Sequence, residues 1–463
     1  MTRIVVVGAG ISGLAAAFEI RRLAAGAGTN VEVVVLEEQD QVGGKVRTVR
    51  ADGYLCETGV QAFLDNSPPT LELAEALGLG PRLRRAQEVA KKRWIYSRGK
   101  LEELPMSPPR FLRSRLVSWP GKLRLALEPF ARKRPAGVDE TVAEFARRRL
   151  GDEALQVLVG PMVAGVFAGD PANLSVKSAF PKVVALEEKY GGLIRGMLAL
   201  RRERGRDVDA GPGGTLTSFD EGMATPCVSL ARSLGDAVRL KTPVRALERR
   251  GAGLRLLLGD GHSDADAVVL AVPAYVQARL LGPLDPDCAG LLDRVPYPPL
   301  AVACLGFRRE DVGHPLDGFG FLVPRREPLR LLGALFESTL FEGRAPAGHV
   351  LIRAMVGGAT NPELCALDDT TLLTLLEKEL GGVLGLKARP VFSRIWRHEQ
   401  AIPQYTVGHG DRVTELEARA AKAGPIIVGG SAYRGISLND CVRNARTVAE
   451  QALARLAPAA GHG

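Results

Sequence analysis

The residues best suited to chemistry stand near the start of the chain, where three glycines follow a short apolar run. Gly8, Gly10 and Gly13 form the pattern G-x-G-x-x-G directly after residues 4–7. In such a pattern the first glycine makes a tight turn, the second admits a pyrophosphate against the backbone, and the third lets helix and strand pack closely. The N–H groups at the start of the following helix would bind the diphosphate. The spacing therefore predicts a dinucleotide site.

An acidic residue completes this unit. A second apolar strand, residues 31–36, ends at Glu37, which stands 24 residues after Gly13. A carboxylate at this place accepts hydrogen bonds from the ribose hydroxyls of a dinucleotide. Strand, helix, strand and acid in this order are far more specific than the glycines alone. Three neighbours are assigned to the same site: Ile11, Ser12 and Glu38.

A second glycine pair narrows the choice of dinucleotide. Gly43 and Gly44 follow the acid closely, and Lys45 and Arg47 come directly after them. The glycines would let the chain approach the diphosphate from another side, and the cations would lie near its charge. The first motif fits NAD or FAD, but the added pair favours FAD.

The composition is that of an ordinary folded protein of two or three lobes. Of 463 residues, 46% are hydrophobic and 24% are charged. No apolar run approaches the ~18 residues that span a bilayer. The first strand begins at residue 4 and leaves no room for a cleaved leader, which favours a cytoplasmic location. Six cysteines and six histidines are scattered without metal-ligand spacing, so we expect neither a metal site nor a disulfide framework.

The positive charge is concentrated in one segment. Residues 81–135 contain sixteen Lys and Arg against four Glu, with Trp94, Trp119 and Phe130 among them. Apolar residues threaded between cations describe a surface that fits anionic lipid, which would place the protein on the inner face of the membrane. A plain solvated basic face is the alternative. Nucleic acid is not expected, because the chain carries no recognised binding motif.

The rest of the chain alternates helical and strand-like stretches. Residues 139–205 carry apolar residues near the helical period, whereas residues 300–355 contain several short β-rich runs. Residues 425–430 form an apolar strand that runs into glycines, and residues 439–456 have helical character. This last strand, turn and helix would complete the nucleotide domain.

Longer segments resemble a known enzyme family. The glycine motifs resemble the flavin-dependent amine oxidase superfamily, in which Arg is usual at the position of Lys45. Within it, the chain resembles the protoporphyrinogen oxidase family over nearly its full length. The matching segments include ETGVQAFLD (57–65), RWIYSRGKLEELP (93–105), GVFAGDPANLSVKSAFP (165–181), LDGFGFLVPRRE (316–327), IPQYTVGH (402–409) and YRGISLNDCVRNA (433–445).

This resemblance implies an α/β fold with three parts. A Rossmann-like FAD-binding domain would be formed by residues 1–80, 213–272 and 395–463. A basic helical lobe, residues 81–212, would touch the membrane through residues 81–135 and contribute to the substrate site. Residues 273–394 would form an inserted, β-rich substrate-binding domain.

The resemblance also assigns cofactor contacts. Gly59 and Gln61 would lie beside the flavin, although many relatives have Asn where Gln61 stands. Val244 would meet the adenine through its backbone, and Trp396 would cover part of the cofactor. The ribityl chain and the flavin ring would be held by Gly430, Gly435, Ile436 and Ser437.

Five further residues are assigned to the substrate by the same resemblance. Arg93 would bind a propionate, since a guanidinium matches a carboxylate. Leu322, Leu335 and Met355 would clamp the macrocycle, and many relatives have Phe where Met355 stands. Gly165 would offer its carbonyl to the pyrrole N–H groups.

The implied activity is FAD-dependent oxidation of protoporphyrinogen IX by dioxygen, giving protoporphyrin IX and hydrogen peroxide in haem biosynthesis. A flavin that accepts hydride needs no protein nucleophile, which agrees with the lack of an obvious one. Family members often form homodimers. The nearest alternative is coproporphyrinogen III oxidation. A classical amine oxidase and a non-catalytic carrier of flavin and porphyrinogen are more remote.

Overall fold

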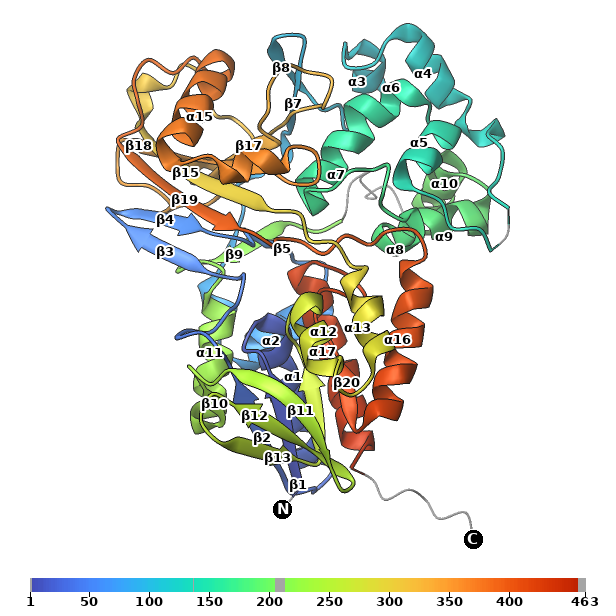
Figure 1. Ribbon diagram of the computed structural model, residues 1–463. Helices are drawn as coiled ribbons and strands as arrows, with labels where there is room; N and C mark the ends of the chain where they lie inside the picture. Colours follow the sequence, from blue (N-terminus) through green and yellow to red (C-terminus); the bar gives the residue numbers. More distant parts are fainter. Residues whose placement is uncertain (1, 136, 205–212, 457–463) are drawn as a thin grey trace.

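The computed structural model describes residues 2–135, 137–204 and 213–456. Figure 1 shows a lower lobe that contains the first strand and the last helix, and an upper part in which a sheet and a group of helices lie side by side. Four pieces of the predicted domains lie outside the described residues: 1, 136, 205–212 and 457–463.

The lower lobe is built around a parallel sheet. In spatial order its described strands are β10 (Val238–Arg239), β2 (Val31–Leu36), β1 (Thr2–Val7), β14 (Ala267–Leu270) and β20 (Ile426–Val428). The strands are rich in Val, Ile and Leu because both faces of the sheet are covered. This is the Rossmann-like α/β arrangement that the sequence predicts.

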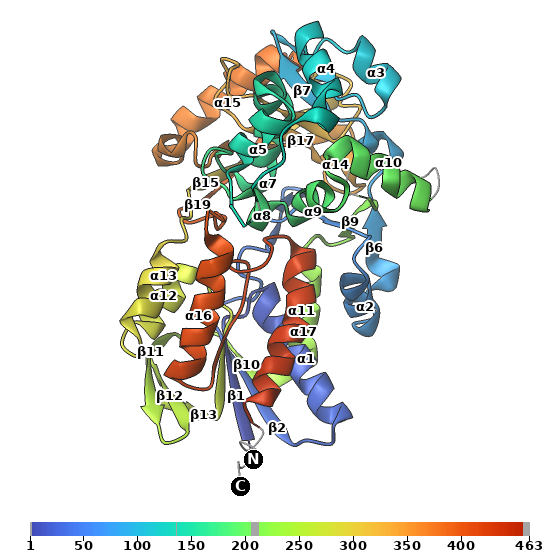
Figure 2. The same cartoon turned by 90° about the vertical axis from the view of Figure 1, so that its right-hand side faces the viewer.

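Helices cover both faces of this sheet (Figure 2). One face packs against α1 (Ile11–Gly26), α2 (Pro68–Ala76), α11 (Thr225–Leu234) and α17 (Leu438–Ala454). The other packs against α12 (Ala274–Leu281), α13 (Pro286–Asp293), α16 (His409–Ala423) and an antiparallel layer of β11 (Val244–Arg250), β12 (Gly253–Leu258) and β13 (His262–Ala265).

Short strands connect the lower lobe to the upper part. A hairpin of β3 (Thr48–Ala51) and β4 (Tyr54–Glu57) reaches up towards the upper sheet, as Figure 1 shows. A small sheet in the order β5 (Phe63–Leu64), β9 (Leu216–Phe219) and β6 (Leu83–Arg85) lies beside it.

The upper sheet is large and mixed. Its described order is β19 (Phe392–His398), β15 (Leu300–Arg308), β18 (His349–Gly357), β17 (Gly333–Phe336), β16 (Gly320–Leu322), β7 (Trp94–Ser97) and β8 (Lys100–Glu103). One face packs against α15 (Asp369–Leu384). The opposite face looks towards the lower lobe, because Cys304 packs there against Tyr54 and Cys56 of β4. The short helix α14 (Glu337–Leu340) follows β17 directly.

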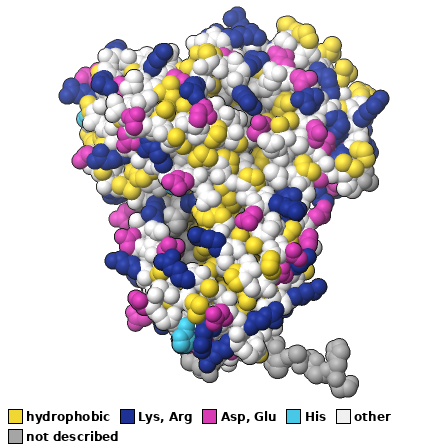
Figure 3. Space-filling view, in the orientation of Figure 1, with side chains coloured by type: hydrophobic (Ala, Val, Ile, Leu, Met, Phe, Trp, Pro, Cys, Tyr) yellow, Lys and Arg dark blue, Asp and Glu magenta, His cyan; other side chains and the backbone are white. Residues whose placement is uncertain are grey.

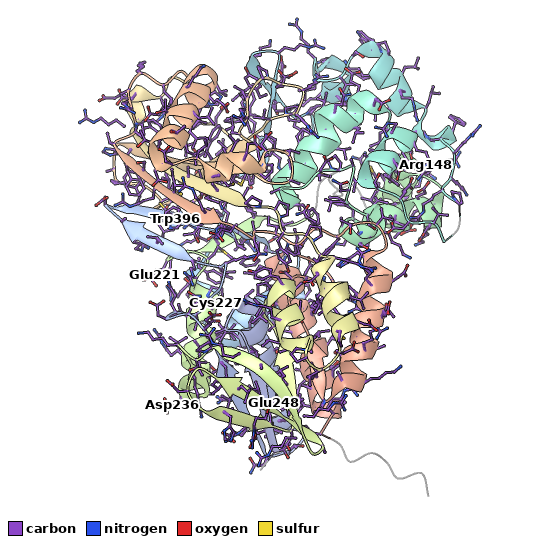
Figure 4. All side chains as sticks on the ribbon, in the orientation of Figure 1. Arg148, Glu221, Cys227, Asp236, Glu248 and Trp396 are labelled. Atoms are coloured by element: carbon purple, nitrogen blue, oxygen red, sulfur yellow. The ribbon has the colours of Figure 1, made fainter. Side chains whose placement is uncertain are left out.

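The helical lobe comprises α3 (Pro108–Arg113), α4 (Trp119–Ala126), α5 (Val142–Arg149), α6 (Asp152–Ala154), α7 (Gly160–Phe167), α8 (Val176–Ala179), α9 (Pro181–Tyr190) and α10 (Leu193–Arg204). Its core contains Phe145, Val163 and Phe167. Charged groups tie the helices together, since Arg149 pairs with Glu128 with both side chains fully buried. Arg148, labelled in Figure 4, bridges the carboxylates of two different segments.

The structure divides two segments differently from the sequence prediction. Residues 94–103 stand in the predicted helical lobe, yet they form β7 and β8 of the upper sheet, because Trp94 and Ile95 pair with β16. The predicted boundary at residue 395 falls inside β19, which also belongs to this sheet. Backbone pairing with distant strands sets both positions, and composition carries no signal for it. Among the described helices, none is long and apolar enough to cross a membrane.

Candidate active site

The glycine loop leaves open space at one position. A Cβ added at Gly10 would meet no atom closer than the carbonyl oxygen of Gly43, at 4.0 Å. At Gly13 it would lie 2.0 Å from the carbonyl oxygen of Gly8. No side chain caps the start of α1, so its first N–H groups are available to an anion. These observations fit a diphosphate lying over Gly10.

The second glycine pair lies against this loop. Gly43 donates its N–H to the carbonyl of Ala9 at 2.8 Å and forms an isolated bridge with Gly10. Gly44 approaches the same place, because its Cβ would lie 3.5 Å from the Cα of Gly10. Arg47 follows, and its buried Nε has no hydrogen-bond partner in the described part of the chain. The two glycine turns therefore lie against each other, and contact of Arg47 with a diphosphate stays a prediction.

The acid at the end of β2 is fixed beside the loop. The Glu37 carboxylate accepts hydrogen bonds from the N–H of Ala9 at 2.6 Å and of Gln39 at 3.0 Å. Its carbonyl accepts the N–H of Thr242 at 2.7 Å, which brings the start of β11 and Val244 close to the acid. Glu38 is exposed. The predicted ribose and adenine contacts thus come from neighbouring segments.

Lys45 reaches a different segment. Its ammonium donates to the carbonyls of Gln400, at 2.5 Å, and Ala401, and lies 5.1 Å from the centre of the Tyr297 ring. Burial lowers the pKa of Lys45 to about 8. Lys45 therefore ties the second glycine turn to the chain that leaves β19, and its contact with a diphosphate stays a prediction.

The glycines near the C-terminus lie close to the start of α1, beside the first glycine loop. Ser12 of α1 and Gly430 line one small cavity together with Cys441 and Asn444 of α17. The N–H of Gly435 donates to the Tyr405 hydroxyl at 2.9 Å. Ser437 caps α17, and Ile436 packs partly against the core of the helical lobe. These residues therefore lie where the lower lobe meets the helices above it.

Strand register places the predicted clamp residues on one face of the upper sheet. One row across the sheet consists of Leu322, Gly333, Met355, Val302 and Trp396. The next row on the same face contains Leu335, Arg353 and Cys304, because alternate residues of a strand point the same way. Cys304 shows that this face looks towards the lower lobe, and Figure 4 labels Trp396 where β19 approaches it.

Gly165 and Arg93 flank this face. A Cβ on Gly165 of α7 would lie 2.9 Å from a methyl carbon of Leu322, so the helix touches the row directly. Arg93 precedes β7, and its guanidinium carbon lies 5.6 Å from the centre of the Phe319 ring. Burial lowers the pKa of Arg93, and among the described residues no carboxylate lies within ion-pair distance of it. It is a partly desolvated cation without a counter-ion among the residues that the structure describes.

Sequence reasoning missed a buried ionic cluster between the lobes. Arg353 donates from Nε to the carbonyl of Glu57 at 3.0 Å and from Nη2 to the carbonyl of Gly59 at 2.5 Å. The Glu57 carboxylate accepts hydrogen bonds from Arg344 at 2.9 Å and from Thr48 at 2.7 Å. Burial raises the pKa of Glu57. A charge inside the apolar run VLIRAM was the available signal, since such residues need a partner.

Gln61 joins the same cluster from the predicted flavin loop. Its amide donates to Oε2 of Glu337 at 3.3 Å. Glycine is required beside it at position 59, because a Cβ there would lie 2.1 Å from the carbonyl oxygen of Lys45. The arrangement leaves space for a dinucleotide over Gly10. Above it lies an apolar face beside Arg93, which has no carboxylate partner in the described part of the chain.

Comparisons with known proteins agree with this geometry. Residues 11–453 match the family model described as flavin containing amine oxidoreductase. Protoporphyrinogen oxidase 1, chloroplastic, of Spinacia oleracea is 34% identical over 95% of this chain and 82% of its own length. Coproporphyrinogen III oxidase of Bacillus subtilis is 29% identical, over 98% of each chain.

Solved structures show the same fold. A provisionally named protoporphyrinogen oxidase from Exiguobacterium superposes with a TM-score of 0.84 at 29% identity, covering 98% of this chain and 99% of that one. Reduced UDP-galactopyranose mutase superposes with a TM-score of 0.76 at 16% identity, covering 99% and 97%. The second likeness concerns the fold alone.

Proposed function

The chain belongs to the flavin-containing amine oxidoreductase family, and we propose that it oxidises protoporphyrinogen IX to protoporphyrin IX with dioxygen as acceptor, giving hydrogen peroxide. It is an FAD-dependent oxidoreductase, so the resemblance and the cofactor predicted from the sequence are confirmed. The substrate follows from the names of the relatives and from the chemistry of the upper face.

The observation that carries this proposal is the unpaired cation beside an apolar row. Leu322, Leu335 and Met355 share one face of the sheet, and Arg93 stands at its edge with no carboxylate partner in residues 2–135, 137–204 and 213–456. A flat tetrapyrrole with propionate side chains offers an apolar body and carboxylates at its rim. The guanidinium fork would gain a charge-assisted bond that it lacks in the free protein.

The cofactor site is assigned to the residues that surround Gly10. The N–H groups of α1 and the paired glycine turns would bind the diphosphate, and Glu37 would hold the ribose. When bound, FAD supplies the hydride acceptor for the reaction. Gly59 and Gln61 would lie beside its ring, while Trp396 would cover part of it. These assignments rest on the motif and on the placement of the glycines.

The chain itself orients the substrate and keeps water out. Arg93 would fix one propionate, and the apolar row would pack on the macrocycle and exclude solvent. Gly165 lies in the last turn of α7, where carbonyls lack partners further along the helix. Its carbonyl would accept hydrogen bonds from pyrrole N–H groups and so set which face of the ring meets the cofactor.

Coproporphyrinogen III is the second candidate, because two bacterial relatives with that name match this chain over nearly its full length. An aerobic assay with each porphyrinogen, followed by porphyrin fluorescence above the spontaneous rate, tests the choice. We expect a higher kcat/KM for protoporphyrinogen IX. A higher value for coproporphyrinogen III would replace the proposed substrate. If neither porphyrinogen reduces the flavin in the absence of oxygen, the protein would instead be a non-catalytic carrier of flavin and porphyrinogen.

We further propose peripheral membrane contact through the surface of α3 and α4. Trp119 and Leu123 are spaced by four residues, so they share one face of α4, and Trp119 is 70% exposed. Leu127 follows directly at the C-terminal end of this helix and is also exposed. Phe130 beside them is 79% exposed. At the top right of Figure 3, where Figure 1 labels α3 and α4, hydrophobic and cationic side chains lie close together. The nearby exposed cations include Arg110, Arg113, Arg115, Arg132 and Lys133.

Vesicle sedimentation tests this contact. The parent protein should bind vesicles that contain anionic lipid and should be released by salt. The double variant Trp119→Ser, Leu123→Ser should bind several-fold less while its activity on detergent-dispersed substrate is unchanged. Equal binding by parent and variant would contradict the proposal. Homodimer formation and the face of the membrane stay predictions.

A further inference from the structure

Glu337 is a buried carboxyl group that the proposed reaction does not use. It begins α14, two residues after Leu335, and is 1% exposed. Its Oε2 accepts the Gln61 amide at 3.3 Å. Its Oε1 is buried without a hydrogen bond among the described residues, and the nearest cation is Nε of Arg353 at 4.0 Å. Because Oε1 is covered by protein, Glu337 does not reach the substrate itself.

Arg353 holds the same loop from the neighbouring strand. It is 3% exposed and stands on β18, two residues before Met355 and opposite Leu335. Its guanidinium binds the carbonyls of Glu57 and Gly59, whereas Glu337 binds the side chain of Gln61. Both ends of the loop 57–61 are thus anchored to residues that adjoin the clamp.

We propose that Glu337 and Arg353 are positioning residues that form a hydrogen-bonded clasp between the flavin-side loop 57–61 and the substrate clamp. The clasp sets the spacing between the cofactor ring and the macrocycle. This inference rests on the proposed function for its kinetic consequence. Its structural part concerns the loop and the cofactor alone.

The surroundings make this clasp stiff. Hydrogen bonds and charges are strong in a medium from which water is excluded, and an unpaired partner there is costly. The charged groups that face Glu337 are Arg353 of β18 and Arg344 of the loop between α14 and β18. Glu57 of β4 pairs with Arg344. The anchors stand within two residues of Leu335 and Met355, so a shift of the loop changes its distance from the clamp directly.

The test compares Glu337→Ala with the isosteric Glu337→Gln in the FAD-loaded protein. A displacement near 1 Å can cost about 10²-fold in rate, so we expect Glu337→Ala to lower kcat about 10-fold to 100-fold with little change in KM. It should also weaken FAD binding and alter the visible spectrum of the bound flavin. Glu337→Gln should restore these properties, because its amide oxygen still accepts from Gln61.

A matched control separates positioning from stability. Glu379 of α15 is also buried, and its carboxylate accepts the N–H groups of Arg330 and Leu331 on the far side of the upper sheet. Glu379→Ala should lower Tm without changing the flavin spectrum or the FAD Kd. If Glu337→Ala behaves in the same way, the clasp is merely structural and the proposal is overturned.

A second variant keeps the test valid if Glu337→Ala does not fold. Gln61→Ala removes the same contact from the loop side and should reproduce the loss of FAD affinity. Combined with Glu337→Gln it should add nothing further, whereas additive losses would contradict the clasp. The FAD readouts do not depend on the substrate. A protein that oxidises neither porphyrinogen would therefore refute the proposed function. The clasp would still be judged from the FAD Kd and the visible spectrum of the bound flavin.

Discussion

The lower and upper halves of the site are built in opposite ways. The lower half uses backbone from residues close together in the chain. Gly10 leaves open space, whereas Gly8 and Gly13 let neighbouring segments pack too closely for a Cβ. The upper half uses side chains from distant segments, such as Leu322 and Trp396, which strand register brings into one row. Binding by backbone tolerates little added volume, whereas binding by side chains depends on how each charge is partnered.

The largest effect should come from adding volume to the lower half. Gly13→Val should prevent folding, because even a Cβ would lie 2.0 Å from the Gly8 carbonyl oxygen. Gly10→Val should fold but lose FAD, since the space around Gly10 is open in the free protein. Circular dichroism and flavin absorbance measure the two outcomes. A folded Gly13→Val protein, or a yellow Gly10→Val protein, would break the contrast.

In the upper half, replacing the buried Arg344 and the half-buried Arg93 should change stability to very different extents. Arg344→Met leaves the Glu57 carboxylate buried without its cation and should lower the free energy of unfolding by about 3–5 kcal/mol. Arg93→Met removes a cation that has no carboxylate partner among the described residues and should change it by less than about 1 kcal/mol. Urea unfolding of both variants tests this difference. Equal losses would mean that pairing does not distinguish the two sites.

Protonation of His409, which begins α16 where the lower lobe meets the helical lobe, should have a smaller effect on stability. Burial lowers the pKa of His409 to about 4, while an unfolded histidine titrates near about 6.5. The unfolded chain therefore binds more protons between these values, and stability is lost as pH falls through this window. The loss should not exceed about 3 kcal/mol.

The control for this titration is His409→Phe, which keeps a ring stacked on Tyr405 at 4.1 Å between centres. Comparing its unfolding free energy with that of the parent at pH 7 and pH 4.5 isolates the histidine. A parent and variant with the same pH dependence would show that other groups cause it.

The smallest expected effect is kinetic. Arg93→Ala should raise KM for the porphyrinogen about 10-fold, the equivalent of one charge-assisted hydrogen bond, and leave the FAD Kd unchanged. Steady-state kinetics and FAD fluorescence measure the two quantities. An unchanged KM would remove Arg93 from the substrate site and reduce the upper half to its apolar row.

The same contrast explains what the sequence could predict. The lower lobe was predictable because its motif is local, and Gly43 indeed lies against Gly10. The clamp residues were assigned through resemblance alone, since no periodicity indicates that Leu322 and Met355 share a row, and their contact with a macrocycle stays a prediction. The clasp of Glu337 and Arg353 went unseen because pairing of buried charges is a property of tertiary contacts. Residues 94–103 were placed in the wrong layer for the same reason, as they pair with a strand more than 200 residues later.

The parallel sheet also has a consequence for how the protein reaches its native state. Its centre pairs β1 with β14, and β14 with the edge strand β20, so these two pairings span a large part of the chain. During synthesis, the first strand can pair early with β2, but its other neighbour, β14, emerges much later. We therefore expect slow folding with a long-lived partly assembled species, in which chaperones and early FAD capture would govern the yield of active protein.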